Sequence, residues 1–586
     1  MTRPVRSRGG RLRQLLRRAP TLLRTVRHLR ARQALAQIHH ALFGLARPRS
    51  AGPATPRLAI PAPATPWLPP PAHVKALPPD RFELLATAFE PPSGEGWSRS
   101  SHGPLFAYHL HQQEYLRLPD VPPARRAAVI ADWIASHRAG IGWDPHPTGL
   151  RLLAWGKLFT TAGGLPDDPA LREAMLRSFA DQAATLAHGL EFRLQANHLL
   201  SNLIGVVYAG LLVDAPAAEA WRSRATLLLD ELARQVHPDG GHEERSPMYH
   251  ASLLEALLDL LNLCRAAPAR APYGLEAGLV RVLPRMVDAL ERLSHGDGRI
   301  ALFADSAFDL AAEPAALRDY AVRLGLVEPA APARDRSGLP ALTAPGSARL
   351  SDTGYVRLAS PRWLLIASVA GPAPAHQPGH AHCDALAFEL SLDGRRLVTD
   401  TGVREYVPGP WRTHARATAS HATLQIDDEE QAEIWAAHRV GGRPAVVVTA
   451  FDAALGVAEA TCRGWSRPDT LHRRRFRVGG REVEIVDSVE GPARRITSRL
   501  PLAPGVTVEL RSTAGPGTDG PAGGFARCRA GDVGGPAIEI ELPTGFAWRV
   551  ETAACHPSFG RTLERPVLVG VGRACIDART IFRLLD

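Results

Sequence analysis

The spacing of apolar residues divides this chain into a helical part and a strand-rich part. From roughly residue 80 to 340, apolar residues recur at helical intervals, in segments such as RRAAVIADWIASH (125–137) and HLLSNLIGVVYAGLL (198–212). Short breaks of Gly, Pro and Asp, such as GGLPDDP, separate these segments. Many helices of similar length with short links indicate stacked helical hairpins.

The pattern of apolar residues changes after about residue 345. Short runs rich in Val, Ile and Leu follow one another, including TGYVRLAS, WLLIASVAG, LAFELSL and REVEIVDSV. Eight or more such strands, punctuated by Gly, Pro and Asp, indicate an antiparallel β-sandwich. Helices followed by strands, without alternation, predict an α+β chain of separate domains.

Composition places the boundaries. The first 47 residues are predicted to form a basic amphipathic helical segment, and residues 48–78, rich in Pro and Ala, a linker. The helical domain then covers 79–340 and the sandwich 346–586, separated by a Pro/Ala/Gly-rich link around 328–347. A chain of 586 residues is long enough for these domains.

Charge and targeting signals narrow the class of partner and the compartment. The net charge of +10 suits an anionic partner, but residues 1–49 contain no Asp or Glu and many Arg, so much of it is local. That segment either lies peripherally on an anionic membrane or packs on its own protein. No long apolar run or signal-peptide core is seen. We therefore expect a location in the cytoplasm or on the cytoplasmic membrane, with the periplasm as the alternative, and no nucleic-acid partner.

A group of histidines and aspartates lies within about forty residues of the strand-rich part. His380 and His382 are two apart, so on a strand they face the same side. Asp393-Gly394 predicts a tight turn, after which Asp400 returns antiparallel. His382, Asp400 and His421 then converge as a metal site, for which zinc is the usual ion. The alternative is a polar sheet face with scattered histidines.

The six cysteines include no C-x-x-C pair, which argues against a disulfide scaffold or a cysteine-based zinc site. Cys383, between the two histidines, is expected to serve core packing.

This stretch resembles the C-terminal domain of the heparinase II/III-like polysaccharide lyases. The segments GHAHCDALAFEL, DTG, WR and SHATLQID match that domain's pattern in order. Related segments lie upstream, namely WDPHPTGLRLLAW, LQANHLLSNLIGVVYAG and DGGHEERSPMYHASLLEALLDLL. The resemblance runs from about residue 75 to 586. It implies an incomplete (α/α) toroid followed by a β-sandwich, and β-elimination on a uronic-acid polymer.

The resemblance also implies roles for single residues. Asn197 would neutralise the substrate carboxylate and His198 would be a base. Tyr249 would be the general acid, or the base for one epimer. His380 would face the substrate from the sandwich. His382, Asp400 and His421 would hold a structural zinc, and the active site would lie between the domains.

Each of these residues has a structural alternative. Asn197 and His198 suit capping or core satisfaction. Tyr249 suits a half-buried position at a helix start, because Ser246-Pro247 predicts an N-cap and first helical residue. Glu243 and Glu244 are interpreted as structural. Four residues are expected to bind substrate, with loop anchoring as the alternative: Arg245, Tyr406, Arg412 and Arg416.

One departure from the family pattern is Ala422, which stands where Asn often follows the metal-binding His. We expect a lyase acting on an acidic polysaccharide, in a chain that could form a homodimer. The alternative function is a binding or assembly protein of exopolysaccharide production on the same fold. A zinc hydrolase is a third class. The sequence does not choose among acidic polysaccharides.

Overall fold

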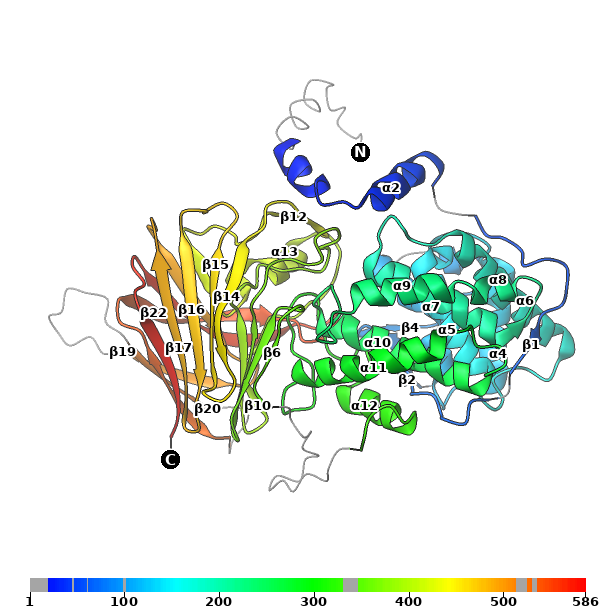
Figure 1. Ribbon diagram of the computed structural model, residues 1–586. Helices are drawn as coiled ribbons and strands as arrows, with labels where there is room; N and C mark the ends of the chain where they lie inside the picture. Colours follow the sequence, from blue (N-terminus) through cyan, green and yellow to red (C-terminus); the bar gives the residue numbers. More distant parts are fainter. Residues whose placement is uncertain are drawn as a thin grey trace, which may run out of the picture.

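The computed structural model describes residues 19–44, 47–60, 62–78, 80–98, 102–329, 346–512, 524–529 and 535–585. Helices fill the first part and strands the second, and the two parts stand side by side (Figure 1). The fold class expected from the sequence, an incomplete (α/α) toroid followed by an antiparallel β-sandwich, is confirmed.

Paired helices build the first domain. They are α3 Gly103–Gln112, α4 Pro123–Ser136, α5 Pro145–Phe159, α6 Pro169–His188, α7 Ala196–Leu212, α8 Ala218–Arg222, α9 Ala225–Gln235, α10 Pro247–Ala266, α11 Leu275–Arg292 and α12 Pro314–Arg323. Ser246 caps α10 as expected, because its Oγ accepts a hydrogen bond from the backbone N–H of Tyr249.

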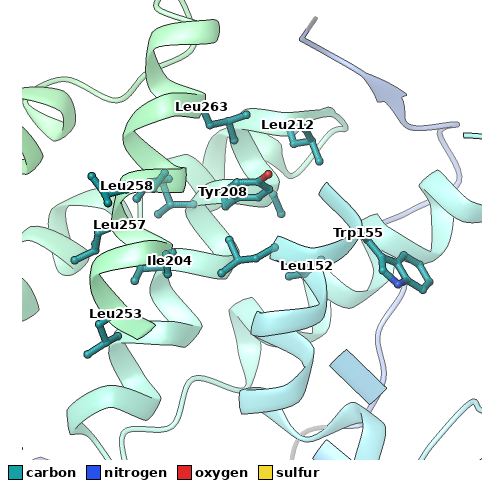
Figure 2. Close-up of a cluster of buried hydrophobic side chains, with 14 of the residues drawn as sticks. Leu152, Trp155, Ile204, Tyr208, Leu212, Leu253, Leu257, Leu258 and Leu263 are labelled. Atoms are coloured by element: carbon teal, nitrogen blue, oxygen red, sulfur yellow. The ribbon is translucent and has the colours of Figure 1, made fainter. Parts of the chain in front are cut away.

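The core of this domain lies between α5, α7 and α10. Leu152, Ile204, Tyr208 and Leu257 are among the side chains buried there (Figure 2). Glycine sets the spacing of α5 and α7, since a Cβ on Gly205 would lie 2.9 Å from the α5 backbone. These two helices therefore cross closely at Gly149 and Gly205.

Short strands lie at the periphery of the helical domain. They were not predicted from the sequence. β1 Arg57–Leu58 pairs with β5 Val213–Asp214, so the segment predicted as a linker runs along the toroid. β2 Val74–Leu77, β3 Arg81–Leu84 and β4 Thr87–Phe89 form a small antiparallel sheet.

Three larger sheets make up the second domain, and their inward faces share an apolar core. One sheet holds β6 Ala348–Leu350, β7 Tyr355–Ala359, β8 Trp363–Ser368, β9 Phe388–Leu392 and β10 Arg395–Val398. Another holds β14 Ala445–Asp452, β15 Val457–Arg463, β16 Leu471–Val478, β17 Glu482–Glu490, β24 Ala578–Leu584, β21 Ala537–Leu542, β20 Gly524–Arg529 and β19 Thr507–Ser512. The third holds β11 Leu424–Ile426, β18 Ile496–Pro501, β23 Leu563–Gly572 and β22 Phe546–Cys555. β12 Ile434–Ala436 and β13 Arg439–Val440 form a small hairpin beside them.

The hairpin predicted around Asp393-Gly394 is present, but it does not carry the histidines. β9 and β10 pair antiparallel across a turn in which both residues have positive φ. His380 and His382 lie in the loop before β9, so the expectation that they face one side of a strand is wrong. Cys383 is buried against Ala432 and Val440, as packing requires.

The N-terminal segment crosses the junction of the two domains (Figure 1). Residues 19–26 are helical, and α2 spans Ala31–Phe43. No helix among the described residues is long and apolar enough to cross a membrane.

Candidate active site between the domains

Asp305 is the centre of the polar cluster where toroid and sandwich meet. It belongs to the loop between α11 and α12, and its side chain is fully buried. Both terminal nitrogens of Arg412, in α13 Pro410–Arg416, donate to its carboxylate. Its two oxygens also lie 2.7 Å from Nδ1 of His380 and 2.9 Å from Nε2 of His382. Burial would raise the pKa of Asp305, but Arg412 and the histidines outweigh it and hold the pKa well below its usual range.

Tyr249 lies against His380 and faces a second tyrosine. The ring centroids of Tyr249 and His380 are 4.3 Å apart, and the hydroxyls of Tyr249 and Tyr406 are 2.8 Å apart. Burial raises the pKa of both phenols, and nearby Asp305 adds to the effect. Both hydroxyls are therefore protonated at neutral pH, and either can donate the hydrogen bond between them.

Asn197 lies in the first turn of α7 and faces a cavity. Its backbone N–H donates to Glu244, 2.9 Å away, while its side-chain amide makes no hydrogen bond within the described part of the chain. The cavity reaches into the toroid and is also lined by Tyr249 and His146. An amide with unused bonding capacity at a cavity wall is available to a ligand.

His198 is oriented by a buried carboxylate. Its Nδ1 lies 3.0 Å from Oε2 of Glu191, and its ring centroid is 4.4 Å from that of His146. Burial would lower the pKa of His198, but Glu191 outweighs burial and raises it. Because Nδ1–H of His198 donates to the Glu191 carboxylate, Nε2 is the nitrogen left with a free lone pair.

His382, Asp400 and His421 converge as the sequence predicts. Each offers one ligand atom, these atoms lie within 4.8 Å of one another, and all three residues are buried. Nδ1 of His382 and Nε2 of His421 have no hydrogen-bond partner in the described structure. Burial lowers the pKa of His382 to about 4, so its imidazole is neutral, as metal binding requires. Two nitrogens and a carboxylate in a buried group fit zinc.

The arginines expected to bind substrate are held by the protein itself. Arg245 donates to the carbonyls of Thr353, Gly354 and Gly371, joining the start of α10 to the sandwich. Arg416 donates to the carbonyls of Ala381, Ala436 and Ala437. Of the four predicted substrate residues, the structure brings Tyr406 and Arg412 to the cluster and places the other two in anchoring contacts.

Sequence reasoning missed Asp305, Glu191 and His146. Asp305 stands alone in ALFADSAF, with no motif around it, and Glu191 lies in the loop before α7. Glu244 was interpreted as structural, yet it also lies 3.8 Å from Nε2 of His380. Glu191 could have been identified from its position, because it lies seven residues before His198 and just before the start of the helix that carries His198.

Comparison with known proteins gives partial matches to curated relatives. The chain is 25% identical to heparin-sulfate lyase of Pedobacter heparinus over 51% of its own length and 47% of the relative. It is 27% identical to FtsZ-localized protein C of Caulobacter vibrioides, over 65% of the chain and 66% of the relative. The chain thus spans about half and about two thirds of these relatives.

Solved structures share the fold. The crystal structure of heparinase III matches with a TM-score of 0.63 at 18% identity, over 85% of this chain and 78% of that one. A heparan sulfate lyase HepC mutant from Pedobacter heparinus matches with a TM-score of 0.56 at 18% identity, over 88% and 81%. The heparinase II/III N-terminus model matches residues 136–321 and the heparinase II/III-like C-terminal model matches 343–565. The chain therefore belongs to the heparinase II/III-like family.

Proposed function

We propose that this protein is a polysaccharide lyase that cleaves a uronic-acid polymer by β-elimination. The observation that carries the proposal is the convergence, at one cavity wall, of an unbonded amide on Asn197 with the phenol of Tyr249. β-Elimination beside a uronic acid has three tasks. The carboxylate is neutralised, the C5 proton is removed, and the leaving oxygen on C4 is protonated.

Asn197 suits the first task. Its amide can donate hydrogen bonds to a carboxylate without titrating itself. Charge that develops at the carboxylate during proton removal is then stabilised by a donor already in place, which is usually the largest single contribution to rate.

His198 and Tyr249 suit the two proton transfers. Glu191 orients the His198 ring, raises the pKa of His198 above its ordinary value and leaves Nε2 to accept the C5 proton. The protonated phenol of Tyr249 donates to the leaving oxygen, and the Tyr406 hydroxyl, 2.8 Å away, supports the phenolate that forms. His380 is held by Asp305 and packs against the Tyr249 ring at an interplanar angle of 39°, so it supports that ring from the sandwich side.

A zinc ion held by His382, Asp400 and His421 would be structural, because it would pin the loop that carries His380. No step of the elimination requires it.

A binding or assembly protein of exopolysaccharide production on the same fold is the second candidate. The relative that aligns over the larger share of this chain is named for its localization with FtsZ, not for an enzymatic activity. A chain of this kind would hold an acidic polysaccharide in the same cavity without turnover.

A panel of acidic polysaccharides tests the proposal. Heparan-type, hyaluronan-like, alginate and bacterial exopolysaccharide substrates are incubated with the full chain, and ultraviolet absorbance and product mass are then measured. The proposal expects unsaturated uronate products from at least one polymer. Binding without products would support the second candidate, and saturated products would mean hydrolysis.

A further inference from the structure

Helix α2 packs on the protein in the reverse of the usual orientation for a surface helix. Its polar side faces the body of the molecule. Gln33 is fully buried and donates to the carbonyl of His376, and Gln37 donates to the carbonyl of Arg193. Arg30, the residue before the helix, donates to the side chain of Gln195.

The apolar side of α2 faces outward. Leu35, Ile38 and Leu42, spaced three and four residues apart, form one stripe and are 68%, 58% and 71% exposed. Phe43, beside this stripe, is 72% exposed. In an ordinary surface helix such a stripe would be the buried one, so this face is built to meet something other than the described body of the protein.

The exposed apolar residues are concentrated in the N-terminal segment. Leu23 and Val26 of the preceding helical turn are also exposed. Six of the fifteen large hydrophobic side chains exposed among the described residues therefore fall between residues 23 and 43. Single exposed hydrophobics are ordinary, whereas a cluster of this size marks an interaction surface.

The charge of the N-terminal segment indicates what binds the apolar stripe of α2. Residues 1–49 contain thirteen Arg and no Asp or Glu. Arg24 and Arg30 are paired with Glu433 and Glu243 of the body, whereas Arg27 and Arg32 are exposed. An apolar stripe flanked by arginine without acidic neighbours in the same segment is the pattern of a helix that lies in an anionic lipid interface.

The segment is held to both domains. Thr21 and Arg24 bind Glu433 of the sandwich, Trp435 donates to Thr25, and Arg32 lies over the ring of Phe192 in the toroid. Figure 1 shows α2 above the junction of the two domains. Whatever binds the stripe therefore takes up a fixed orientation relative to the whole molecule.

We propose that the stripe formed by Leu35, Ile38, Leu42 and Phe43 docks on an anionic phospholipid surface, with the surrounding arginines contacting the headgroups. The side chains of the stripe enter the boundary between headgroups and acyl chains, and the polar face stays on the protein. The docking does not depend on lyase activity, so it stands or falls separately from the proposed function.

Vesicle co-sedimentation of the full chain tests the proposal. Vesicles of phosphatidylcholine with phosphatidylglycerol are compared with vesicles of phosphatidylcholine alone. We expect binding to the mixed vesicles, about tenfold or more weaker binding to the neutral ones, and loss of the difference at high salt. Failure of wild-type protein to bind mixed vesicles would overturn the proposal.

The variant L35E/I38E/L42E removes the stripe, and the variant L455E/I576E is its matched control. Leu455 and Ile576, in turns of the sandwich, are 70% and 80% exposed. All the substituted side chains are exposed, so both variants should melt close to wild type. The first should lose vesicle binding by about tenfold or more, and the second should retain it. Equal binding by both would contradict the proposal. So would a wild-type dimer that the first variant converts to monomer without any vesicle binding, because the stripe would then be a self-association surface.

Discussion

The two sides of the interdomain site are built in opposite ways. Where the sandwich reaches the toroid loop that carries Asp305, the carboxylate is saturated: Arg412, His380 and His382 of the sandwich all bond to it. On the toroid side, the amide of Asn197 is unbonded and faces a cavity. Polar groups that are already satisfied give rigidity, whereas unsatisfied ones at a cavity wall have capacity for a ligand.

Backbone strain lies beside the groups on both sides. Gln195 and Ala196 before Asn197, and Arg245 before Tyr249, have φ near +60°, +47° and +60°, and Ala304 before Asp305 has φ near +55°. Non-glycine residues in this region cost about 1 kcal/mol or more each, and such strain concentrates at functional sites. The comparison teaches that the toroid supplies the reacting groups and the sandwich holds them in place.

The largest expected effect is on stability, and it tests the contacts that hold Asp305. Asp305→Asn leaves the buried guanidinium of Arg412 without a counter-charge, and we expect it to lower the free energy of unfolding by about 3–5 kcal/mol. Asp393→Asn, at the exposed pair with Arg362, is the matched control and should cost about 1 kcal/mol or less. Urea unfolding measures both. Equal losses would remove the distinction between the saturated side and an ordinary surface pair.

The next largest effect is on kcat/KM, and it tests the reacting groups of the toroid. Asn197→Ala should lower kcat/KM by about 10²–10³-fold, because the substrate carboxylate loses its donor. Its stability should change little, since the amide makes no hydrogen bond in the described structure. Asn262→Ala is the control, because that buried amide bonds the Thr65 carbonyl and the Tyr320 hydroxyl. It should cost about 1–3 kcal/mol and spare kcat. The reverse pattern would contradict the account.

Loss of the bound metal is expected to have a smaller effect, on the melting temperature. The purified protein should hold about one zinc per chain, and His382→Ala should lose it and melt several degrees lower. His188→Ala, at the end of α6 and far from this cluster in sequence, should retain the zinc. Elemental analysis and thermal melting measure both variants. Carefully prepared wild type without zinc would refute the prediction.

The smallest effect concerns pH. Glu191 raises the pKa of His198, and a base works only when deprotonated, so kcat/KM should rise as pH increases through that pKa. In Glu191→Gln the charge is gone and the pKa falls, so the acidic limb should move to lower pH by roughly one unit. A limb that stays in place or moves upward would exclude His198 as the base.

Local features of the sequence predicted local structure well. The Asp393-Gly394 turn and the Ser246 cap depend on neighbouring residues alone, and both are present. The division into a helical and a strand-rich domain followed from the change in apolar period near residue 345, whereas the toroid shape followed from the family resemblance. Contacts between distant segments could not be predicted in this way: Asp305 meets His380 across 75 residues, and nothing in the composition around it signals that contact.

Arginine shows the same limit. Arg245 and Arg416 have the chemistry of carboxylate recognition, but in the structure their guanidinium N–H groups donate to backbone carbonyls of the sandwich. The sequence shows which donors are available and does not show which acceptors the fold brings to them.

Tyr249→Phe tests the central claim most directly, because it removes only the hydroxyl that would protonate the leaving oxygen. With a polymer that the wild type cleaves, kcat, product mass and melting temperature are measured together for both proteins. We expect wild-type products with a C4–C5 double bond, a fall in kcat of roughly 10²–10⁴-fold in the variant, and a melting temperature changed only by the loss of one hydrogen bond to Tyr406. Full activity in Tyr249→Phe, or saturated products from the wild type, would contradict the account.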